Sequence, residues 1–234
     1  MRIEKTFVRN FLSSRHNNWG VLAGASFLTI CFIMSLFYWD KSYPISSFLS
    51  ASRDTIFVNG EYWRLFTTSF IHGDLQHLLA NSLMLYILTY FVTSFYGGLQ
   101  SLIVSSIMGV AINLFVLYQY QTNTTLVGAS GIVYYLWGFW LTLYFFIQTH
   151  QTVLGRILRI GAVFFILLIP TQYSPSTSYL AHYFGFLIGL GVGCLYYLLK
   201  RKKLHSFEIW KFKVIQDDDL DFDWKESTSI KPSL

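Results

Sequence analysis

A serine lies among small residues at the start of a long apolar stretch. Gly128, Ala129 and Gly131 flank Ser130, and the apolar segment continues to Ile147. A hydroxyl in the first turn of a helix lies beside backbone N–H groups that have no helical acceptor, and these groups favour a developing negative charge. Ser130 is therefore a candidate nucleophile for acyl transfer. Small residues are also common where membrane helices pack closely, so this stretch alone does not distinguish a nucleophile from a packing residue.

Two other segments carry polar groups that could serve this serine. His77 and Asn81 share one face of a helix because they are four residues apart, and both could donate hydrogen bonds to one point. His182 lies in another apolar run and could act as a general base. Each group alone could instead form a hydrogen bond between packed helices, worth ~0.6 kcal/mol per bond. Ionisable and amide groups inside a membrane segment are functional candidates by default.

The composition places these residues in a membrane protein. Of the 234 residues, 53% are hydrophobic and only 12% are charged, too few charges for an ordinary soluble domain. Apolar runs long enough to cross ~30 Å of hydrocarbon predict membrane spans. We expect six of them, at residues 19–39, 77–96, 99–118, 127–147, 154–170 and 179–199. The predicted fold class is an all-α membrane protein.

The positions of lysine and arginine predict the orientation, because cationic loops stay on the cytoplasmic side. Cationic residues precede the first span, lie between the fourth and fifth spans, and follow the sixth span. We therefore expect a multi-pass protein of the cell membrane with both termini in the cytoplasm. The net charge of +5 is a topology signal. Binding to nucleic acid would need a basic face interleaved with aromatic residues, and the sequence has none.

This orientation brings the polar groups to one depth. The second, fourth and sixth spans all begin at the outer face, and helix rise places His77, Asn81, Ser130 and His182 within ~10 Å of it. Serine with imidazole makes a nucleophile and its base, and the donor pair could stabilise an oxyanion. Asp and Glu are absent from these spans. The sequence therefore predicts a Ser-His dyad, with Tyr134 stacking on the imidazole in place of an acid.

The flanking segments differ from the spans in composition. Residues 1–18 are basic with apolar residues at helical spacing, which predicts a short interfacial helix on the cytoplasmic side. Residues 40–74 mix charges with aromatic residues, which is typical of a structured loop at the headgroup interface. Residues 200–234 form a cytoplasmic tail that is first basic and then acidic. Its acidic-aromatic stretch from Asp217 to Trp224 is typical of disorder and sometimes of partner binding.

Taken together, the motifs resemble those of the rhomboid family of intramembrane serine proteases. They are Trp63-Arg64 in the first loop, His72-x4-His77-x3-Asn81 on the second span, Gly128-Ala129-Ser130-Gly131 with Tyr134 on the fourth, and Ala181-His182-x2-Gly185-x3-Gly189 on the sixth. The resemblance covers residues 19–199. It implies a six-helix bundle with an interfacial first loop, which cleaves single-span transmembrane proteins near the outer face of the lipid bilayer without a cofactor.

The resemblance also implies roles by motif position. Ser130 would be the nucleophile, His182 its base, and His77, Asn81 and the Ser130 backbone N–H the oxyanion hole. The supporting residues would be Tyr134, His72, Trp63, Arg64, Gly128, Gly131, Gly185 and Gly189, with Trp63-Arg64 anchoring the first loop in the interface. The second span commonly ends in a Gly and Glu pattern in this family. Here residues 89–93 read Thr-Tyr-Phe-Val-Thr, which leaves the tethering of the inner end open.

Two other functions stay possible at this stage. A proteolytically silent relative would bind membrane clients, but the intact Ser130 and His182 argue against it. A metal hydrolase could use His72, His77 and His182 as an open zinc site. Membrane metalloproteases need a nearby acid such as the Glu of H-E-x-x-H, and the spans around these histidines contain none.

Overall fold

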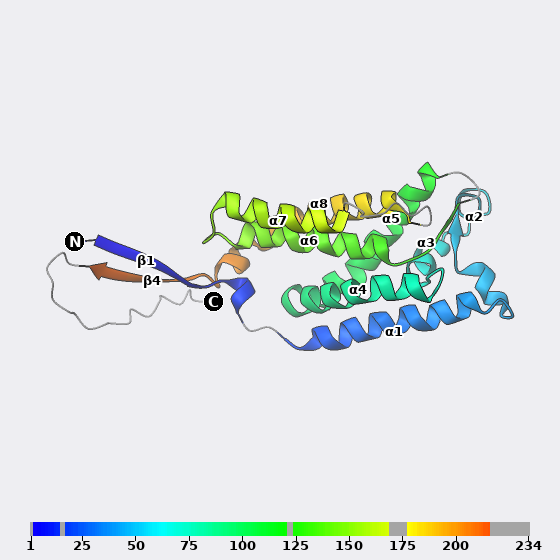
Figure 1. The fold of residues 1–234 in the computed structure, drawn as a ribbon, viewed down its shortest axis with the longest axis horizontal. Coiled ribbons are helices and arrows are strands. Elements are labelled where there is room, and N and C mark those ends of the chain that lie inside the picture. Colours follow the sequence, from blue (N-terminus) through cyan, green and yellow to red (C-terminus); the bar gives the residue numbers. More distant parts are fainter. Residues whose placement is uncertain (1, 15–16, 121–123, 169–176, 216–234) are drawn as a thin grey trace.

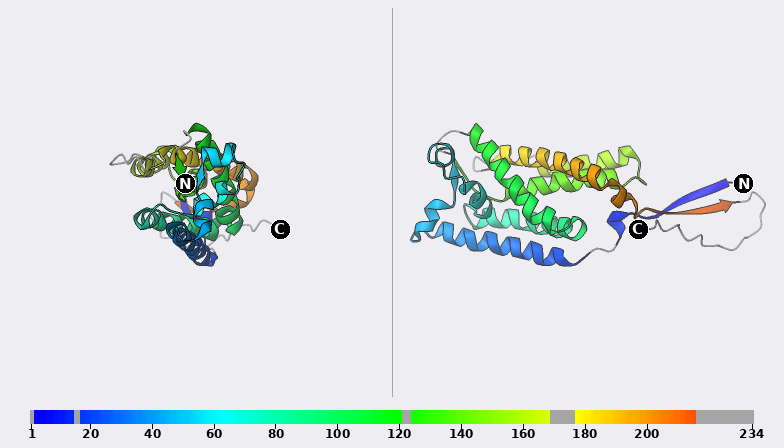
Figure 2. Two further views of the ribbon diagram at one scale, coloured as in Figure 1. Left: turned by 90° about the vertical axis from the view of Figure 1, so that its right-hand side faces the viewer. Right: turned by 180° about the vertical axis from the view of Figure 1, so that it is seen from behind.

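The computed structural model describes residues 2–14, 17–120, 124–168 and 177–215. Its main body is a bundle of long helices, from one end of which a two-stranded ribbon projects (Figure 1). The long helices are α1 (Trp19–Trp39), α4 (Leu75–Tyr96), α5 (Ser105–Gln119), α6 (Ser130–Ile147), α7 (Val153–Leu168) and α8 (Tyr179–His205), and the π-helical turn η4 (Leu99–Val104) leads into α5. α6 and α8 pack along each other, α4, α5 and α7 contact α6, and α1 lies at the outside of the bundle against α4 (Figure 2).

Most of the predicted spans are present as membrane-length helices. Among the described residues, five helical segments are long and apolar enough to cross a membrane: Trp19–Trp39, Leu75–Tyr96, Leu99–Gln119, Ser130–Ile147 and Tyr179–His205. The span expected at residues 154–170 coincides with α7, a helix of 16 residues ending at Leu168. Residues 169 and 170 of that expected span lie outside the described residues. The chain is thus a mostly helical, multi-pass membrane protein.

The pair α6 and α8 forms the centre of the bundle, and small residues allow their close contact. A Cβ on Gly189 would lie only 2.9 Å from the backbone nitrogen of Phe139. A Cβ on Gly185 would lie 3.3 Å from the carbonyl carbon of Gly131. Two backbones can approach so closely only where side chains are missing. The four-residue spacing of small residues along α8 is therefore a packing face against α6.

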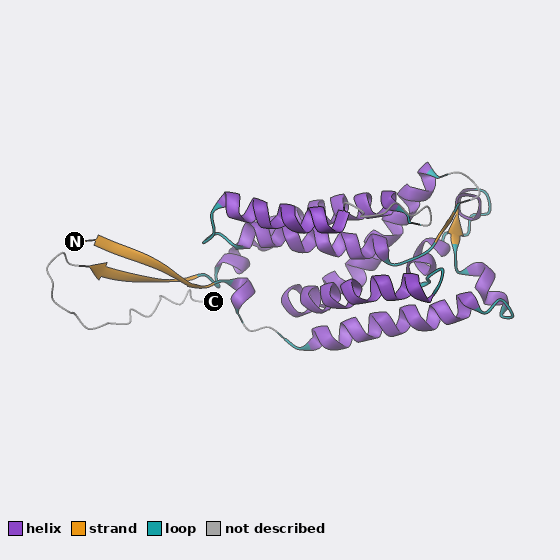
Figure 3. Ribbon diagram, viewed as in Figure 1, coloured by secondary structure: helices purple, strands orange, loops and turns teal. Residues whose placement is uncertain are grey.

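The loop after α1 is structured, as its composition predicts. It contains η2 (Pro44–Phe48), β2 (Ala51–Ser52), α2 (Arg53–Phe57), α3 (Arg64–Thr67) and η3 (Thr68–Phe70). The strand β2 pairs with β3 (Thr125–Leu126), which lies directly before the Ser130 region. Both short strands lie at the end of the bundle away from the long ribbon (Figure 3).

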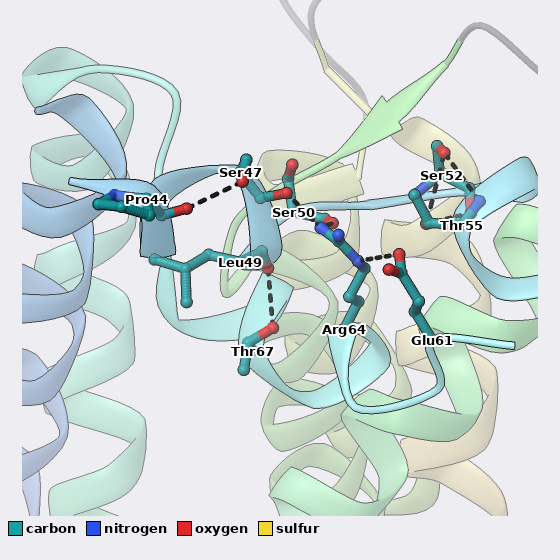
Figure 4. A network of polar contacts seen from close by, with 9 residues as sticks. All are labelled: Pro44, Ser47, Leu49, Ser50, Ser52, Thr55, Glu61, Arg64 and Thr67. Carbon is teal, nitrogen blue, oxygen red and sulfur yellow. Dashed lines mark hydrogen bonds and ion pairs between the residues drawn. The ribbon is translucent and has the colours of Figure 1, made fainter. Parts of the chain in front are cut away.

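A buried arginine holds this loop together. The Arg64 guanidinium donates Nε–H to the Glu61 carboxylate at 2.7 Å, and its Nη1 donates to the carbonyls of Ser47 at 2.6 Å and Ser50 at 2.9 Å (Figure 4). Only 5% of Arg64 is exposed, whereas 52% of Trp63 is exposed. The two residues expected to anchor the loop therefore differ in position. Arg64 is buried and hydrogen-bonds to other residues of the same loop, whereas the Trp63 ring is exposed.

The expected interfacial helix in residues 1–18 is wrong. Residues Arg2–Arg9 form the strand β1, which pairs antiparallel with β4 (Ile209–Ile215) at the far end of the bundle (Figure 1). Ile3 lies opposite Val214, and Phe7 opposite Trp210. The local spacing of apolar residues suggested a helix. A pairing partner two hundred residues away supplies the backbone hydrogen bonds instead.

The segment after β1 closes this end of the bundle. The ring of Phe11, in the turn η1 (Phe11–Ser13), is 5% exposed and lies 5.6 Å from the Tyr96 ring and 5.2 Å from the Phe207 ring. The Asn10 amide donates to Gln148 Oε1 at 2.9 Å. Phe11 and Asn10 thereby contact the chain at the ends of α4, α6 and α8 together.

Candidate active site

A cavity of about 380 Å³ opens among the first turns of α4, α6 and α8, at the end of the bundle opposite the β1–β4 ribbon (Figure 1). Five predicted site residues line it: His77, Asn81, Ser130, Tyr134 and His182. They come from three helices far apart in the sequence. The structure therefore brings together the groups that the sequence analysis placed at one depth.

The serine occupies the first position of its helix. α6 begins at Ser130, and its first helical hydrogen bond runs from the Val133 N–H to the Ala129 carbonyl at 3.0 Å. The N–H groups before Val133 have no acceptor within the helix, so they lie beside the Ser130 hydroxyl at the positive end of the helix dipole. This is the arrangement that stabilises a negative charge developing next to the serine.

Gly128 allows the loop before Ser130 to lie against a histidine. Its φ of +116° lies in the region that side chains rarely adopt. A Cβ at this position would be 2.9 Å from Cε1 of His77. The Gly128 N–H donates to the Thr68 carbonyl at 3.0 Å, which ties the serine loop to the first loop. Gly128 thus sets the distance between the serine loop and the first turn of α4.

His182 is held by stacking. The Tyr134 ring lies parallel to the imidazole, with centroids 4.1 Å apart and an angle of 18° between the planes. Ser178 caps α8 by accepting the Ala181 N–H at 3.3 Å, and its hydroxyl is 2.6 Å from the Tyr120 hydroxyl. The stacking fixes the plane of the imidazole, and the cap fixes the start of the helix that carries it.

The donor pair on α4 is ordered by its own helix. The Asn81 side-chain amide donates to the His77 carbonyl at 3.1 Å, one turn earlier. The Asp74 carboxylate caps α4 by accepting the His77 N–H at 2.7 Å. Because this carboxylate caps the helix, it does not line the cavity. Among the described residues that line the cavity there is no carboxylate, which fits a dyad and not a triad.

His72 lies behind the cavity wall and does not line it. Its side chain is fully buried, its Nδ1 is 3.4 Å from the Ser35 hydroxyl, and its ring is nearly perpendicular to that of His77, with centroids 5.1 Å apart. Burial, and secondly the neighbouring His77, lower the pKa of His72 to about 4, although Asp74 opposes the shift. His72 is therefore a neutral ring that supports His77 from the protein interior.

The remaining supporting residues act through packing. Gly131, Gly185 and Gly189 allow close contact of helices, and Trp63 and Arg64 lie in the first loop outside the cavity. Within the described part of the chain, no cluster of three His, Cys, Asp or Glu side chains is placed to bind a metal ion. The geometry of the three histidines His72, His77 and His182 thus gives the zinc hypothesis no support.

Several residues that form the site were not singled out from the sequence. Ala80, Met84, Tyr120, Trp137 and Ser178 also line the cavity. A serine directly before an apolar helix is a recognisable cap signal, so Ser178 could have been found. The others are ordinary apolar or hydroxyl residues of membrane helices, and only the three-dimensional arrangement places them at the site.

An amide on α5 connects the first loop to the bundle. The Asn113 side chain donates to the Leu65 carbonyl and to the Ser69 hydroxyl, both at 2.8 Å. Its partners lie in α3 and η3, next to Thr68, whose carbonyl accepts a hydrogen bond from the Gly128 N–H of the serine loop. Asn113 therefore supports the site indirectly.

Comparisons with known proteins agree with this arrangement. A family model described as "Rhomboid domain" matches residues 59–199, a range that contains every residue discussed for the cavity. The chain is also 26% identical over 144 residues to a protein described as "Putative rhomboid protease YdcA" from Bacillus subtilis (strain 168). That alignment covers 57% of this chain and 69% of the relative.

Proposed function

The chain belongs to the rhomboid family, and from this premise we propose that it is an intramembrane serine endopeptidase with Ser130 as nucleophile and His182 as general base. The observation that supports the proposal best is the shared cavity. It collects a hydroxyl at a helix start, an imidazole stacked on a tyrosine, and two side-chain donors. The proposed substrates are single-span transmembrane proteins, cut near the outer face of the membrane.

In the proposed reaction, His182 accepts the proton of the Ser130 hydroxyl while the oxygen attacks the substrate carbonyl carbon. His77, Asn81 and the Ser130 backbone N–H donate hydrogen bonds to the resulting oxyanion. The intermediate collapses as the peptide C–N bond breaks, and His182 gives its proton to the leaving amine. Water then attacks the ester with His182 again accepting a proton, and the serine is regenerated.

The stacked tyrosine supplies what an acid would supply in a triad. A carboxylate normally orients the imidazole and stabilises its protonated form. Here the Tyr134 ring contacts the face of the His182 ring at 4.1 Å, so it fixes the imidazole plane. An aromatic face also attracts a cation, which favours the imidazolium formed during the reaction.

We further propose six membrane spans, with α7 as the fifth, in the cell membrane. The cavity would face the outer side and both termini the cytoplasm. The distribution of lysine and arginine supports this orientation. The helix starts that line the cavity lie at the opposite end of the bundle from the β1–β4 ribbon (Figure 1).

Cleavage of a reporter with an Ala-rich helix near the outer face tests the proposal. The wild type and a Ser106→Ala control should cut it, because the Ser106 hydroxyl on α5 hydrogen-bonds only to the Leu102 carbonyl in η4, one turn earlier. Ser130→Ala should not cut it. An absence of cleavage by the wild type would favour the silent, client-binding relative. Activity that a chelator abolishes and zinc restores would replace the serine mechanism with a metal mechanism.

A fluorophosphonate probe tests the two roles directly, because it reacts covalently with an activated serine. The wild type should be labelled, and Ser130→Ala and His182→Ala should not. Equal labelling of the wild type and His182→Ala would remove the assignment of the base. Labelling that persists in Ser130→Ala would remove the assignment of the nucleophile.

A further inference from the structure

The ribbon at the far end of the bundle has an edge available for pairing. β4 pairs with β1 along one edge, and no other described strand pairs with it (Figure 3). A two-stranded ribbon by itself is marginally stable in water, and three strands with an apolar face are much more so. An open strand edge also presents a row of backbone N–H and C=O groups to any compatible segment.

The two faces of the ribbon differ in character. On one face the opposed pairs are Ile3 with Val214, Lys5 with Phe212 and Phe7 with Trp210, and on the other they are Glu4 with Lys213 and Thr6 with Lys211. The first face is apolar apart from Lys5, whose ammonium lies 3.9 Å from the centre of the Trp210 ring. Phe212 is 59% exposed and Val214 is 50% exposed. The ribbon is therefore amphipathic and leaves aromatic and aliphatic surface uncovered.

The sequence just beyond β4 has the complementary pattern. Residues 216–234 lie outside the described residues, and within them residues 219–224 read Asp-Leu-Asp-Phe-Asp-Trp. Acidic and apolar residues alternate strictly, with the period of two that distributes side chains to opposite faces of a strand. Three residues, Gln216, Asp217 and Asp218, separate this segment from the end of β4. Three-residue connections are common in antiparallel hairpins.

We propose that residues 219–224 bind along the second edge of β4 as a third, antiparallel strand. Counting outward from the three-residue connection gives one register. It opposes Lys213 to Asp221 and Lys211 to Asp223 on one face, and Val214 to Leu220, Phe212 to Phe222 and Trp210 to Trp224 on the other. Of these five pairs, the two charged pairs are of opposite sign and the three others are apolar, while the pair that closes the connection sets Asp219 opposite Ile215.

This register is selective because of the alternation. A slip by one residue in either direction would place Asp221 and Asp223 opposite apolar side chains of β4 and Phe222 opposite a lysine. Opposite charges and aromatic pairs directly across strands both stabilise a sheet. Lys211 is exposed, so the Asp223 carboxylate can reach it without displacing buried groups. The occupant that fits this edge is thus the protein's own acidic segment.

The docking would link both ends of the chain to the bundle. The ribbon leads directly into Asn10 and Phe11, which contact the ends of α4, α6 and α8. A third strand that stabilises the ribbon would therefore keep these two residues in place. The proposal rests on the ribbon and the sequence after it, and it does not depend on the protease activity.

Disulfide trapping in the full-length protein tests the register. With Cys31 and Cys194 replaced by Ala, Lys211→Cys combined with Asp223→Cys places two thiols on directly opposed positions, ~4.5–5.5 Å apart between Cα atoms, which a disulfide can bridge. The matched control combines Lys211→Cys with Phe222→Cys, whose side chain points to the other face. We expect the first pair to form an intramolecular disulfide several-fold faster than the control. Equal rates, or a disulfide between two molecules, would overturn the proposal.

Hydrogen exchange on the chain with native cysteines gives a second test that needs no engineered pair. Deleting residues 217–234 should accelerate exchange of those β4 amides that do not bond to β1, and leave the amides of α6 unchanged. Lys211→Asp should accelerate it as well, and adding Asp223→Lys should slow it again. Unchanged β4 exchange after the deletion, or no restoration by the charge swap, would contradict the docking.

Discussion

A single methyl group at Gly189 should displace Ser130 and His182, the two members of the proposed dyad, relative to each other. This glycine lies on the face of α8 that touches α6, and an added Cβ would meet the backbone carbonyl of Tyr135 and lie 2.9 Å from the backbone nitrogen of Phe139. Both obstacles are backbone atoms within a helix, so neither can rotate away. The Gly189→Ala variant must therefore move one helix relative to the other.

The size of the effect follows from this contact. Ordinary van der Waals contact begins near 3.4 Å, so the Phe139 nitrogen alone requires a shift of about half an ångström, and the Tyr135 carbonyl requires more. Overpacking of this kind costs about 1–3 kcal/mol of stability. His182 lies two turns before Gly189 on the same rigid helix, while Ser130 lies on α6. Because a misplacement of about 1 Å can reduce a rate ~10²-fold, we expect cleavage to fall by roughly 10- to 100-fold.

Gly191→Ala is the matched control for this prediction. It makes the same chemical change on the same helix, but a Cβ there meets nothing within 4 Å. Both variants should be compared by thermal unfolding in detergent and by reporter cleavage. Gly191→Ala should behave as the wild type or be slightly more stable, because alanine favours helix. If Gly189→Ala matched Gly191→Ala in melting temperature and in cleavage rate, the close α6–α8 contact would not position the dyad.

Three further changes separate the roles of other residues. Asn81→Ala should reduce cleavage by at most ~10²–10³-fold, because the other proposed oxyanion donors remain. It should slow fluorophosphonate labelling without abolishing it. Complete loss of labelling would assign Asn81 a different role. His72 has a folded-state pKa of about 4, below its ordinary 6.5, so the unfolded chain takes up the proton first as the pH falls. The wild type should therefore lose up to about 3 kcal/mol of stability between pH 6.5 and 4, measured by thermal unfolding. His72→Gln should not show this pH-dependent loss. An identical pH profile of stability in the variant would refute the assignment to His72. Arg64→Met removes the hydrogen bonds to Glu61 and to two carbonyls of the first loop. It should cost about 2 kcal/mol or more of stability and speed limited proteolysis of that loop. An unchanged melting temperature and proteolysis rate would contradict this role.

The five site residues that line the cavity could be predicted because each lies on a helix whose start is visible in the sequence. Once the spans are placed, helix rise alone fixes the depth of Ser130, His77 and His182 to within a turn. The four-residue spacing of glycines on α8 also predicts which face of that helix contacts a neighbouring helix. The stack of Tyr134 on His182 was expected from the one-turn spacing between Tyr134 and Ser130, and the structure confirms it.

The end of the bundle that carries the β1–β4 ribbon could not be predicted in this way. The pairing of β1 with β4 joins residues two hundred positions apart, and no local pattern carries such a distant partner. The helical spacing of Ile3, Phe7 and Phe11 was therefore misleading. In a strand, Ile3 and Phe7 also share one face, so the same residues satisfy both periods. Only the pairing with β4 distinguishes the strand from the helix.

This end of the bundle also bears on the one departure from the family pattern. Residues 89–93 of α4 lack the Gly and Glu pattern, but Thr93 instead shares a hydrogen bond of 2.5 Å with the Ser101 hydroxyl of η4. One turn further, the Tyr96 ring packs edge-on against Phe139 of α6 at 5.5 Å, and Phe11 covers it. Phe11 lies outside the range that the family model matches. The tether of this end is therefore supplied in part by the chain's own N-terminal segment, which a comparison restricted to the shared core does not reveal.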